Sequence, residues 1–473
     1  MSNAYEEAYR LSLDDPEKFW GKIAEDVRWI KKWDKVLDDS NKPFYRWFTG
    51  GELNTCFNAV DRHVEEGRAD QVALIYDSPV TGGTVRKYTY RELQNEVATF
   101  AGVLVANGVG KGDRVIIYMP MVPEAAIAML SCARIGAVHS VVFGGFASNE
   151  LALRINDAEP KIIVSASCGI EVNRVIEYMP LLNGAIDLAK HKPDGCIVLQ
   201  RPEAKAELTE RRDVDWSEAM EGAEAVDCVP VLATDPLYIL YTSGTTGNPK
   251  GAVLTNANLF SLRQPAEAAA QPWSSWDEDE AILICMPCAH IGGTGLGIMA
   301  IAAGIRAIVQ AEFTPDGVLD AFEQGITRLF IVPAALQMVV QHPRAKDTDM
   351  SAVKYVMYGA APIPLDLLRE AVQTIPGAGF LQCYGMTETT GTIAMLPPED
   401  HALDGNQRMR SAGKAVPGAE LKVVGEDGTE LPRGEVGELV CKSPSNMQGY
   451  WNLPDATKGA LKDGWMHTGD AAY

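Results

Sequence analysis

From residue 72 onward, short apolar runs alternate with longer amphipathic segments. The runs are typical of buried strands and lie at 72–76, 85–89, 113–119, 137–143 and 161–164. The longer segments have the period of amphipathic helices and lie at 90–107, 123–135 and 148–158, with Thr89 placed to cap the first. Strands that alternate with helices in this way predict a parallel sheet covered by helices.

A second series of the same kind follows residue 280, and the pattern changes near residue 412. The second series predicts strands at 281–286, 305–311, 328–333, 353–359 and 378–383, with helices between them. After residue 412, short runs at 420–424 and 437–441 predict antiparallel strands. We therefore predict an α/β fold with two successive α/β subdomains, mostly parallel sheets, and a small β-rich subdomain.

Aromatic residues are scattered through the first 70 residues among many charged ones. Their irregular spacing predicts an extended, partly helical arm that packs on the main body. Asn54 is placed to cap a helix from about Cys56 to Glu66, ended by Gly67. The predicted divisions are 1–70 for the arm, 71–230 and 231–411 for the α/β subdomains, and 412–473 for the β-rich subdomain.

Composition narrows the class of protein. The 473 residues are 47% apolar and 22% charged, which is ordinary for a large globular protein. The net charge of −21 argues against nucleic acid or an anionic membrane surface as the main partner. The acidic, polar start is no signal peptide and no run of 18 apolar residues occurs, so we expect a cytoplasmic protein without membrane insertion.

Nine cysteines are scattered along the chain, and only Cys285 and Cys288 form a close C-x-x-C pair. Such a pair can serve redox chemistry or bind zinc. Here no second pair or histidine cluster lies nearby, and an apolar run at 281–284 precedes it. We therefore expect both thiols to be buried and reduced.

The segment from Tyr241 to Gly251 carries the strongest chemical signal. It follows an apolar run at 237–240 and is rich in glycine and hydroxyl side chains. Its hydroxyl and N–H groups can donate to phosphate oxygens, and its lysine adds positive charge. It is not a Walker A loop, because the lysine is flanked by Pro249 and Gly251. A phosphate clamp is favoured over a plain surface loop, with Thr242, Ser243, Gly244, Thr245, Thr246, Gly247 and Lys250 as the candidate residues.

Four further motifs follow in order, from Tyr358 to Pro362, Tyr384 to Glu388, Gly434 to Leu439 and Gly464 to Asp470. With the loop, they give the chain a resemblance to the adenylate-forming superfamily: acyl- and aryl-CoA synthetases, luciferases and adenylation domains of peptide synthetases. The arm and the stretches at 117–121, 142–146 and 235–241 resemble acetyl- and propionyl-CoA synthetases within it.

The resemblance implies a site for each part of ATP. The implied nucleotide-binding residues are Gly359, Ala360, Ala361, Tyr384, Gly385, Met386, Thr387 and Asp470, with adenine on the first three and ribose at the last. Thr242, Lys250 and Glu388 are the implied catalytic residues, and Glu388 the implied Mg²⁺ ligand, which suits that ion's preference for carboxylates and phosphate oxygens. The alternatives without a ligand are a solvated glutamate for Glu388 and a plain turn aspartate for Asp470.

The same resemblance implies contacts to the other two substrates. His290, Gly292 and Gly385 border the acyl pocket, although an isolated histidine after a strand is more often a satisfied core residue. Arg174 matches a position that contacts CoA phosphate in acetyl-type relatives. The neighbouring arginine of that family is Glu171 here, which weakens the match.

The implied reaction joins a carboxylate to ATP, giving an acyl-adenylate and pyrophosphate, and then transfers the acyl group to CoA. ATP, Mg²⁺ and CoA are the implied cofactors and a small carboxylic acid the partner. The protein would supply positioning and charge neutralisation more than covalent chemistry. The family continues past the end of this chain into a lid domain that carries the adenylating lysine. We therefore expect this chain alone to bind nucleotide and to adenylate weakly.

Behind Leu254 the sequence resembles medium- and long-chain fatty acyl- or aryl-CoA ligases, so we expect a recombined chain. Acetyl-type enzymes close the acyl pocket with a tryptophan where this chain has Gly385. We expect an AMP-forming acyl-CoA synthetase for short- to medium-chain acids longer than propionate. An adenylation domain for a carrier protein and a non-catalytic module that binds nucleotide or acyl-adenylate stay as alternatives. Neither the acid nor the oligomeric state follows from these motifs.

Overall fold

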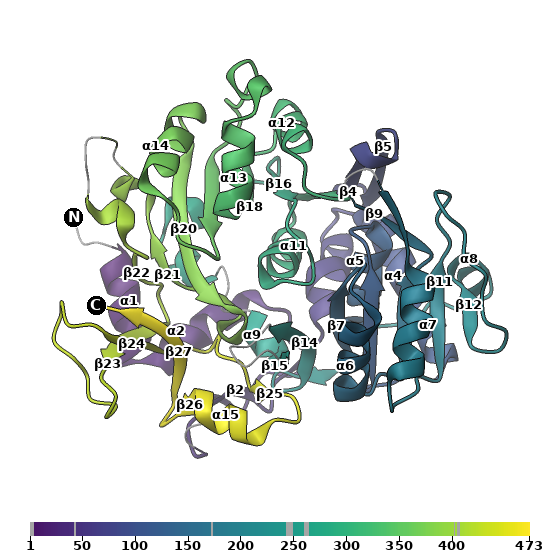
Figure 1. Cartoon of the computed structure of the whole chain (residues 1–473). Coiled ribbons are helices and arrows are strands. Elements are labelled where there is room, and N and C mark those ends of the chain that lie inside the picture. The colour runs from purple at the N-terminus through teal and green to yellow at the C-terminus, as the bar shows by residue number, and fades with distance from the viewer. Residues whose placement is uncertain are drawn as a thin grey trace.

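Two large β-sheets stand side by side with helix α11 (Ile291–Ala303) between them (Figure 1). The computed structural model describes residues 4–41, 44–171, 174–242, 249–259, 264–401, 403 and 407–473. A small antiparallel sheet and the N-terminal arm lie below the large sheets in the view of Figure 1. The predicted α/β class with a small β-rich part is confirmed.

The first large sheet has eight strands. In spatial order they are β12 (Asp213–Asp215), β11 (Gly195–Leu199), β8 (Ile162–Ala166), β6 (Arg114–Met119), β7 (Val138–Phe143), β14 (Pro236–Thr242), β15 (Lys250–Thr255) and β25 (Gly449–Tyr450). The first six are parallel, whereas β15 and β25 are antiparallel additions at one edge. Its central strands are buried on both faces, which explains their continuous apolar runs.

The second large sheet has nine strands. In spatial order they are β22 (Lys414–Ala415), β21 (Gly391–Leu396), β20 (Gly379–Met386), β19 (Tyr355–Gly359), β18 (Arg328–Ile331), β16 (Ala281–Ile284), β17 (Arg306–Gln310), β4 (Val72–Ser78) and β5 (Thr84–Thr89). Strands β4 and β5 belong here although they come early in the chain, because β4 pairs with β17 in parallel. The sheets therefore do not follow the predicted division at residue 231, and the domain boundaries stay a prediction.

Helices cover both sheets, as the amphipathic pattern predicts. They are α4 (Tyr90–Ala106), α5 (Pro123–Arg134), α6 (Ser148–Ala158), α7 (Tyr178–Leu188), α12 (Pro315–Glu323), α13 (Pro333–Val340) and α14 (Leu365–Thr374). Thr89 caps α4 as predicted, and the Glu92 side chain accepts the Thr89 backbone N–H in return at 2.8 Å. Within the described ranges, every helix falls short of the length and apolar content needed to span a bilayer.

The arm packs on the C-terminal part of the chain. It comprises α1 (Ala4–Asp14), α2 (Pro16–Ile23), β1 (Lys35–Asp38) and β2 (Arg46–Thr49). The Tyr5 hydroxyl donates to the Ala415 carbonyl at 2.7 Å. The indole of Trp20 is buried and lies so close to Gly418 that a Cβ there would be 2.2 Å from the ring. The predicted arm, anchored by aromatic side chains, is confirmed.

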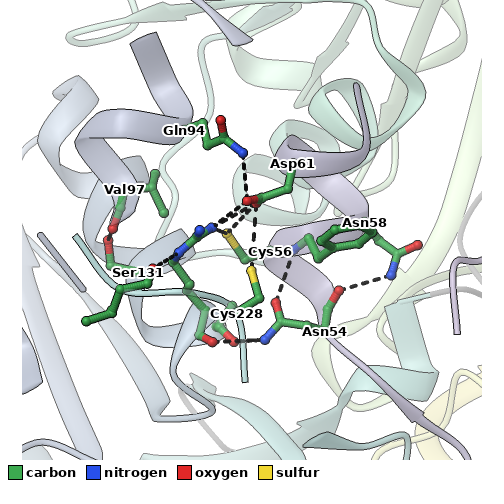
Figure 2. Close-up of polar contacts among 12 residues, drawn as sticks. Asn54, Cys56, Asn58, Asp61, Gln94, Val97, Ser131 and Cys228 are labelled. Atoms are coloured by element: carbon green, nitrogen blue, oxygen red, sulfur yellow. Dashed lines mark hydrogen bonds and ion pairs between the residues drawn. The ribbon is translucent and has the colours of Figure 1, made fainter. Parts of the chain in front are cut away.

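A buried polar network joins the end of the arm to the helices of the first sheet (Figure 2). Asn54 accepts the Phe57 N–H at 3.1 Å and so caps the next helix, as predicted. That helix contains a π-helical turn, η2 (Phe57–Asp61), before α3 (Arg62–Glu65). Asp61 on this turn accepts hydrogen bonds from Arg134 of α5 at 2.8 and 2.9 Å and from Gln94 of α4 at 2.8 Å. The network therefore fixes the arm to two helices of the main body.

The small sheet has the strand order β23 (Glu420–Val424), β24 (Gly437–Lys442), β27 (Trp465–Ala472) and β26 (Leu461–Lys462), and α15 (Pro454–Ala460) leads into it. All four strands are antiparallel to their neighbours, as predicted for this region. The nine cysteines are all free thiols. Cys285 is buried, whereas Cys288 is only half-buried, so the expectation of two buried thiols holds for one of them.

Candidate functional site

Two β-hairpins, one from each large sheet, meet at Glu388. Strands β14 and β15 end at the pair Thr242–Lys250, and β20 and β21 end at the pair Met386–Gly391. Since Lys250 begins a strand and not a helix, the first hairpin differs from a Walker A loop as predicted. The predicted phosphate-binding residues at its tip lie outside the described residues; they are Ser243, Gly244, Thr245, Thr246 and Gly247.

A cavity of about 1030 Å³ opens between the two hairpins, α11 and the small sheet. Its polar part is lined by Thr242, Lys250, Thr387, Glu388 and Tyr450. Its apolar part is lined by side chains from α11, from strands of the second sheet and from residues just after two of those strands, namely Met286, Ile291, Leu296, Met299, Phe330, Val332 and Met357. The cavity thus joins a region suited to a charged ligand with a region suited to an apolar chain.

Glu388 is the buried carboxylate of this cavity, with an exposed fraction of 4%. It lies in the short 3₁₀-helix η6 (Thr387–Thr389) at the tip of the second hairpin. Its Oε1 accepts hydrogen bonds from the Tyr450 hydroxyl at 2.8 Å and from the Thr242 hydroxyl at 3.4 Å. Burial and then the charge of Glu388 raise the pKa of Tyr450, so its phenol remains a donor at neutral pH.

Among the described residues, none gives a hydrogen bond to the second oxygen of Glu388. Both hydrogen bonds that the described residues give to this carboxylate fall on Oε1, and Glu388 lines the cavity. The Lys250 ammonium lies nearby, 5.2 Å from the centre of the Tyr450 ring. A buried carboxylate with one open oxygen beside a lysine provides groups that can hold a divalent cation and phosphate oxygens.

A further polar cluster lies at the edge of the cavity. The Tyr384 hydroxyl on β20 donates to Asp470 Oδ2 on β27 at 2.6 Å. Burial and then this hydrogen bond raise the pKa of Tyr384. The Glu438 carboxylate on β24 accepts from His467 Nδ1 at 2.8 Å and from the Gly469 backbone N–H at 3.0 Å. Glu438 thereby fixes the part of β27 that presents Asp470.

The sequence was compared with protein families and with curated proteins. Residues 60–451 match the model described as AMP-binding enzyme. The chain belongs to this family. Residues 5–59 match the model described as acetyl-coenzyme A synthetase N-terminus, so the arm of this AMP-binding enzyme is of acetyl-CoA synthetase type, as predicted.

Relatives match this AMP-binding enzyme along nearly its whole length. Human acyl-CoA synthetase short-chain family member 3, mitochondrial, is 37% identical over 99% of this chain and 70% of its own. The acetyl-coenzyme A synthetase of Pyrobaculum aerophilum is 33% identical over 99% of this chain and 73% of its own. Acyl-CoA synthetase short-chain family member B, mitochondrial, of Dictyostelium discoideum is 33% identical over 99% and 70%. These matches run through both sides of Leu254, and the expected recombination there stays a prediction.

In this AMP-binding enzyme the motif expected to hold adenine, residues 359–361, presents mainly backbone, which we call the backbone shelf. Gly359 ends β19, and a Cβ there would lie 2.1 Å from the Cys383 carbonyl oxygen, so only glycine fits. Ala360 follows with φ +65°, in the left-handed region, and lines the cavity. Ala361 is exposed. The strained alanine and the lack of large side chains leave room for a flat ring to lie on the backbone.

The residues expected to border the acyl pocket are brought together, but Gly385 has a second constraint. Gly385 and Gly292 line the cavity, and His290 is exposed to it just before α11. A Cβ on Gly385 would lie 1.8 Å from the Gly391 carbonyl oxygen, and one on Gly292 would lie 2.8 Å from the Phe330 ring. Packing of β20 on β21 therefore requires glycine at 385 whatever the width of the pocket.

The remaining predicted residues divide into two groups. Met386 and Thr387 line the cavity beside Glu388. Arg174 is exposed on β10 (Arg174–Glu177) and does not line the cavity, so its expected contact with CoA stays a prediction. Sequence reasoning missed Tyr450, Phe330 and Glu438. The only signal for Tyr450 was a Gly-Tyr-Trp triplet just after the motif at 434–439, and that signal did not point to Glu388.

Proposed function

We propose that this AMP-binding enzyme is an AMP-forming acyl-CoA synthetase for short- to medium-chain carboxylic acids, with ATP, Mg²⁺ and CoA as cofactors. The observation that carries the proposal is the cavity in which the half-open Glu388 carboxylate and Lys250 adjoin an apolar chamber. The names of the relatives, acyl-CoA and acetyl-coenzyme A synthetases, support the acid and thiol classes.

Each part of ATP has a matching group in the cavity or at its edge. The backbone shelf at Gly359 and Ala360 offers a surface to adenine. The Asp470 carboxylate, fixed by Tyr384, accepts hydrogen bonds from ribose hydroxyls. Lys250 and Thr242, the last pair of the first hairpin before its connecting segment, offer the phosphates a positive charge and a hydroxyl.

Glu388 fits the role of Mg²⁺ ligand, because Mg²⁺ prefers one or two carboxylate oxygens together with phosphate oxygens and water. Glu388 lines the cavity, its Oε1 accepts from two hydroxyls, and no described residue donates to its Oε2. When bound, the ion neutralises charge on the phosphates and so favours departure of pyrophosphate.

The chemistry proceeds in two displacements. A carboxylate oxygen of the acid attacks the α-phosphorus, and the bond from that phosphorus to the bridging oxygen breaks to release pyrophosphate. The sulfur of CoA then attacks the acyl carbonyl carbon, AMP leaves, and the thiol proton passes to water. The residues of the cavity hold the reactants in position and neutralise charge, which can account for a large share of the acceleration.

The apolar chamber decides which acid is accepted. Its walls are aliphatic and thioether side chains together with the ring of Phe330, and a glycine stands at position 385. Such a lining favours acyl chains longer than propionyl, since each buried methylene contributes about 0.8 kcal/mol. The nine free cysteines favour a reducing compartment, and we propose the cytoplasm.

A series of acyl-sulfamoyl-adenosines from acetyl to octanoyl tests the proposal without requiring turnover. We expect calorimetric titration to show affinity rising beyond the propionyl compound and exceeding that of AMP. Tightest binding of the acetyl compound would refute the pocket argument. Lack of binding by every compound in the series would refute the function.

Phe330→Ala sharpens this test. Removing the ring should move the tightest binding toward longer acyl chains, because Phe330 lies in the wall next to Gly292. Met338→Ala on the exposed face of α13 is the matched control, since it removes a large apolar side chain that is 54% exposed, and we expect it to leave the series unchanged.

A further inference from the structure

Tyr450 lies on a segment that joins the two hairpins of the site. On one side, Tyr450 pairs with Ala252 on β15, and the Trp451 backbone N–H donates to the Gly251 carbonyl at 2.7 Å. On the other side, the Met447 backbone N–H donates to the Glu388 carbonyl at 2.7 Å. The segment at 447–451 therefore holds the lysine-bearing hairpin and the Glu388 hairpin in a fixed relation.

The Tyr450 side chain also links the two hairpins, because it contacts one charged side chain on each. Its hydroxyl donates to Glu388 Oε1 at 2.8 Å, and its ring lies 5.2 Å from the Lys250 ammonium. A cation at this distance is attracted by the face of an aromatic ring. One half-buried side chain thus contacts both the anion and the cation of the cavity.

This arrangement keeps two opposite charges apart. In the described part of the chain no ion pair within 4.0 Å joins Lys250 to Glu388, although both line one cavity. A direct pair would occupy the carboxylate oxygen that a metal needs and the ammonium that phosphate needs. Tyr450 gives each charge a partner that leaves it open to a ligand.

We propose that Tyr450 is a positioning residue for metal binding, an inference that rests on the proposed function. It holds Glu388 through Oε1, so that Oε2 is the oxygen presented to Mg²⁺. It also keeps Lys250 beside its ring and away from Glu388. Hydrogen-bonded partners of this kind set the orientation of ligating carboxylates, and their loss commonly costs about 10–100-fold in metal affinity.

Tyr450→Phe tests the proposal because it removes the hydroxyl and retains the ring beside Lys250. The readout is Mn²⁺ binding, followed by electron paramagnetic resonance in the presence of α,β-methylene-ATP. We expect Mn²⁺ affinity to fall about 10-fold. Affinity for the analogue without metal should stay within about 2-fold, because the ring still holds Lys250.

Two companion variants separate positioning from folding. Tyr355→Phe is the matched control: this tyrosine also lies beside a cation, with the Arg328 guanidinium 4.8 Å from its ring, but it does not line the cavity. We expect it to bind Mn²⁺ as the parental protein does. In a Glu388→Gln background, Tyr450→Phe should cause no further loss, because the two residues act through one carboxylate.

The outcomes are distinct. Parental Mn²⁺ affinity in Tyr450→Phe would overturn this inference and leave the proposed function standing. Equal loss of metal-free and metal-dependent nucleotide affinity would also overturn it, because that pattern marks general damage to the site. Failure of the parental protein to bind the nucleotide analogue would overturn the proposed function and this inference together.

Discussion

Asp61 and Glu388 are both buried carboxylates, with exposed fractions of 6% and 4%, but their surroundings differ. Both oxygens of Asp61 are occupied: Oδ1 accepts from Gln94 and Arg134, and Oδ2 accepts from Arg134 (Figure 2). Glu388 receives its two hydrogen bonds from the described residues on one oxygen only. The first carboxylate is closed by the protein, whereas the described residues leave one oxygen of the second available to a ligand.

The contrast shows that residue types alone do not make a metal site. The sulfur atoms of Cys56 and Cys228 and a carboxylate oxygen of Asp61 lie within 4.8 Å of one another, which is close to the spacing of metal ligands. The Arg134 guanidinium already neutralises Asp61 with two hydrogen bonds and contacts Cys56 Sγ at 3.7 Å. A cation is thus already built into the Asp61 cluster, and this favours a structural role for it. At Glu388 no described cationic side chain takes this position, which is available to a bound cation.

Breaking the closed carboxylate should have the largest effect. Arg134→Met leaves Asp61 charged and buried without its cation, and we expect the free energy of unfolding to fall by about 3–5 kcal/mol. Urea unfolding followed by tryptophan fluorescence measures this change. Arg344→Met is the control, because Arg344 also forms ion pairs, with Asp316, Asp320 and Glu323, but does so at the surface, and its unfolding midpoint should not move. A parental midpoint for Arg134→Met would contradict the structural role of Asp61.

Neutralising the open carboxylate should affect binding and not stability. Glu388→Gln retains an oxygen that can accept from Tyr450 and Thr242 but removes the charge that a metal requires. We expect Mn²⁺ affinity in the presence of nucleotide to fall about 10–100-fold, with an unchanged or higher unfolding midpoint. Calorimetry and urea unfolding on one protein preparation measure both quantities. Lower stability with parental Mn²⁺ affinity would reverse the assignment of the two carboxylates.

A third carboxylate, that of Glu280, is also held by cationic side chains of the protein, and the pH dependence of stability tests its role. Burial alone would raise the pKa of Glu280, but hydrogen bonds from Arg328 and Lys354 outweigh it and lower the pKa to about 2. Because this pKa lies below its unfolded value of about 4.5, the contribution of Glu280 to stability is present above pH 4.5 and is lost as the pH falls toward 2. We expect a smaller effect than for Arg134, since the Lys354 side chain is 44% exposed and water screens it.

The measurement is the unfolding midpoint between pH 5 and pH 3, compared with that of Glu280→Gln. The parental protein should lose more stability over this interval than the variant, because only the parental protein protonates the paired carboxylate. An equal loss of stability with falling pH in the two proteins would show that the paired Glu280 carboxylate does not stabilise the fold.

Local features of the fold were predicted well because they depend on short-range pattern. The capped start of α4 at Thr89 and the strands of both α/β series follow from residues adjacent in sequence. Sheet membership was not predictable in this way. The hairpin of β4 and β5 joins the second sheet through β17, whereas β6, the next strand along the chain, lies in the first sheet, since pairing between distant strands is set by tertiary packing.

The candidate site likewise has a part that was predictable from the sequence and a part that was not. The motif residues Thr242, Lys250 and Glu388 were chosen from sequence and do lie around one cavity. The hydrogen bond from Tyr450 to Glu388 crosses between hairpins of different sheets, so no local pattern marks it. The partners of Asp61 come likewise from α4 and α5, and each looks ordinary in its own helix.

The tight contact at Gly385 restricts the evolutionary paths open to this site. The resemblance to acetyl-type enzymes implies a tryptophan at the matching position, yet any side chain here would collide with the backbone of β21. The backbone of the β20–β21 hairpin would have to shift before a bulky residue could be accommodated at position 385. Substitutions elsewhere in β20 and β21 must therefore come first. Changes of acid preference should therefore begin at side chains of the pocket wall that can be replaced without moving the backbone, such as Phe330. Directed evolution toward acetate by substitution of residue 385 alone should yield misfolded protein.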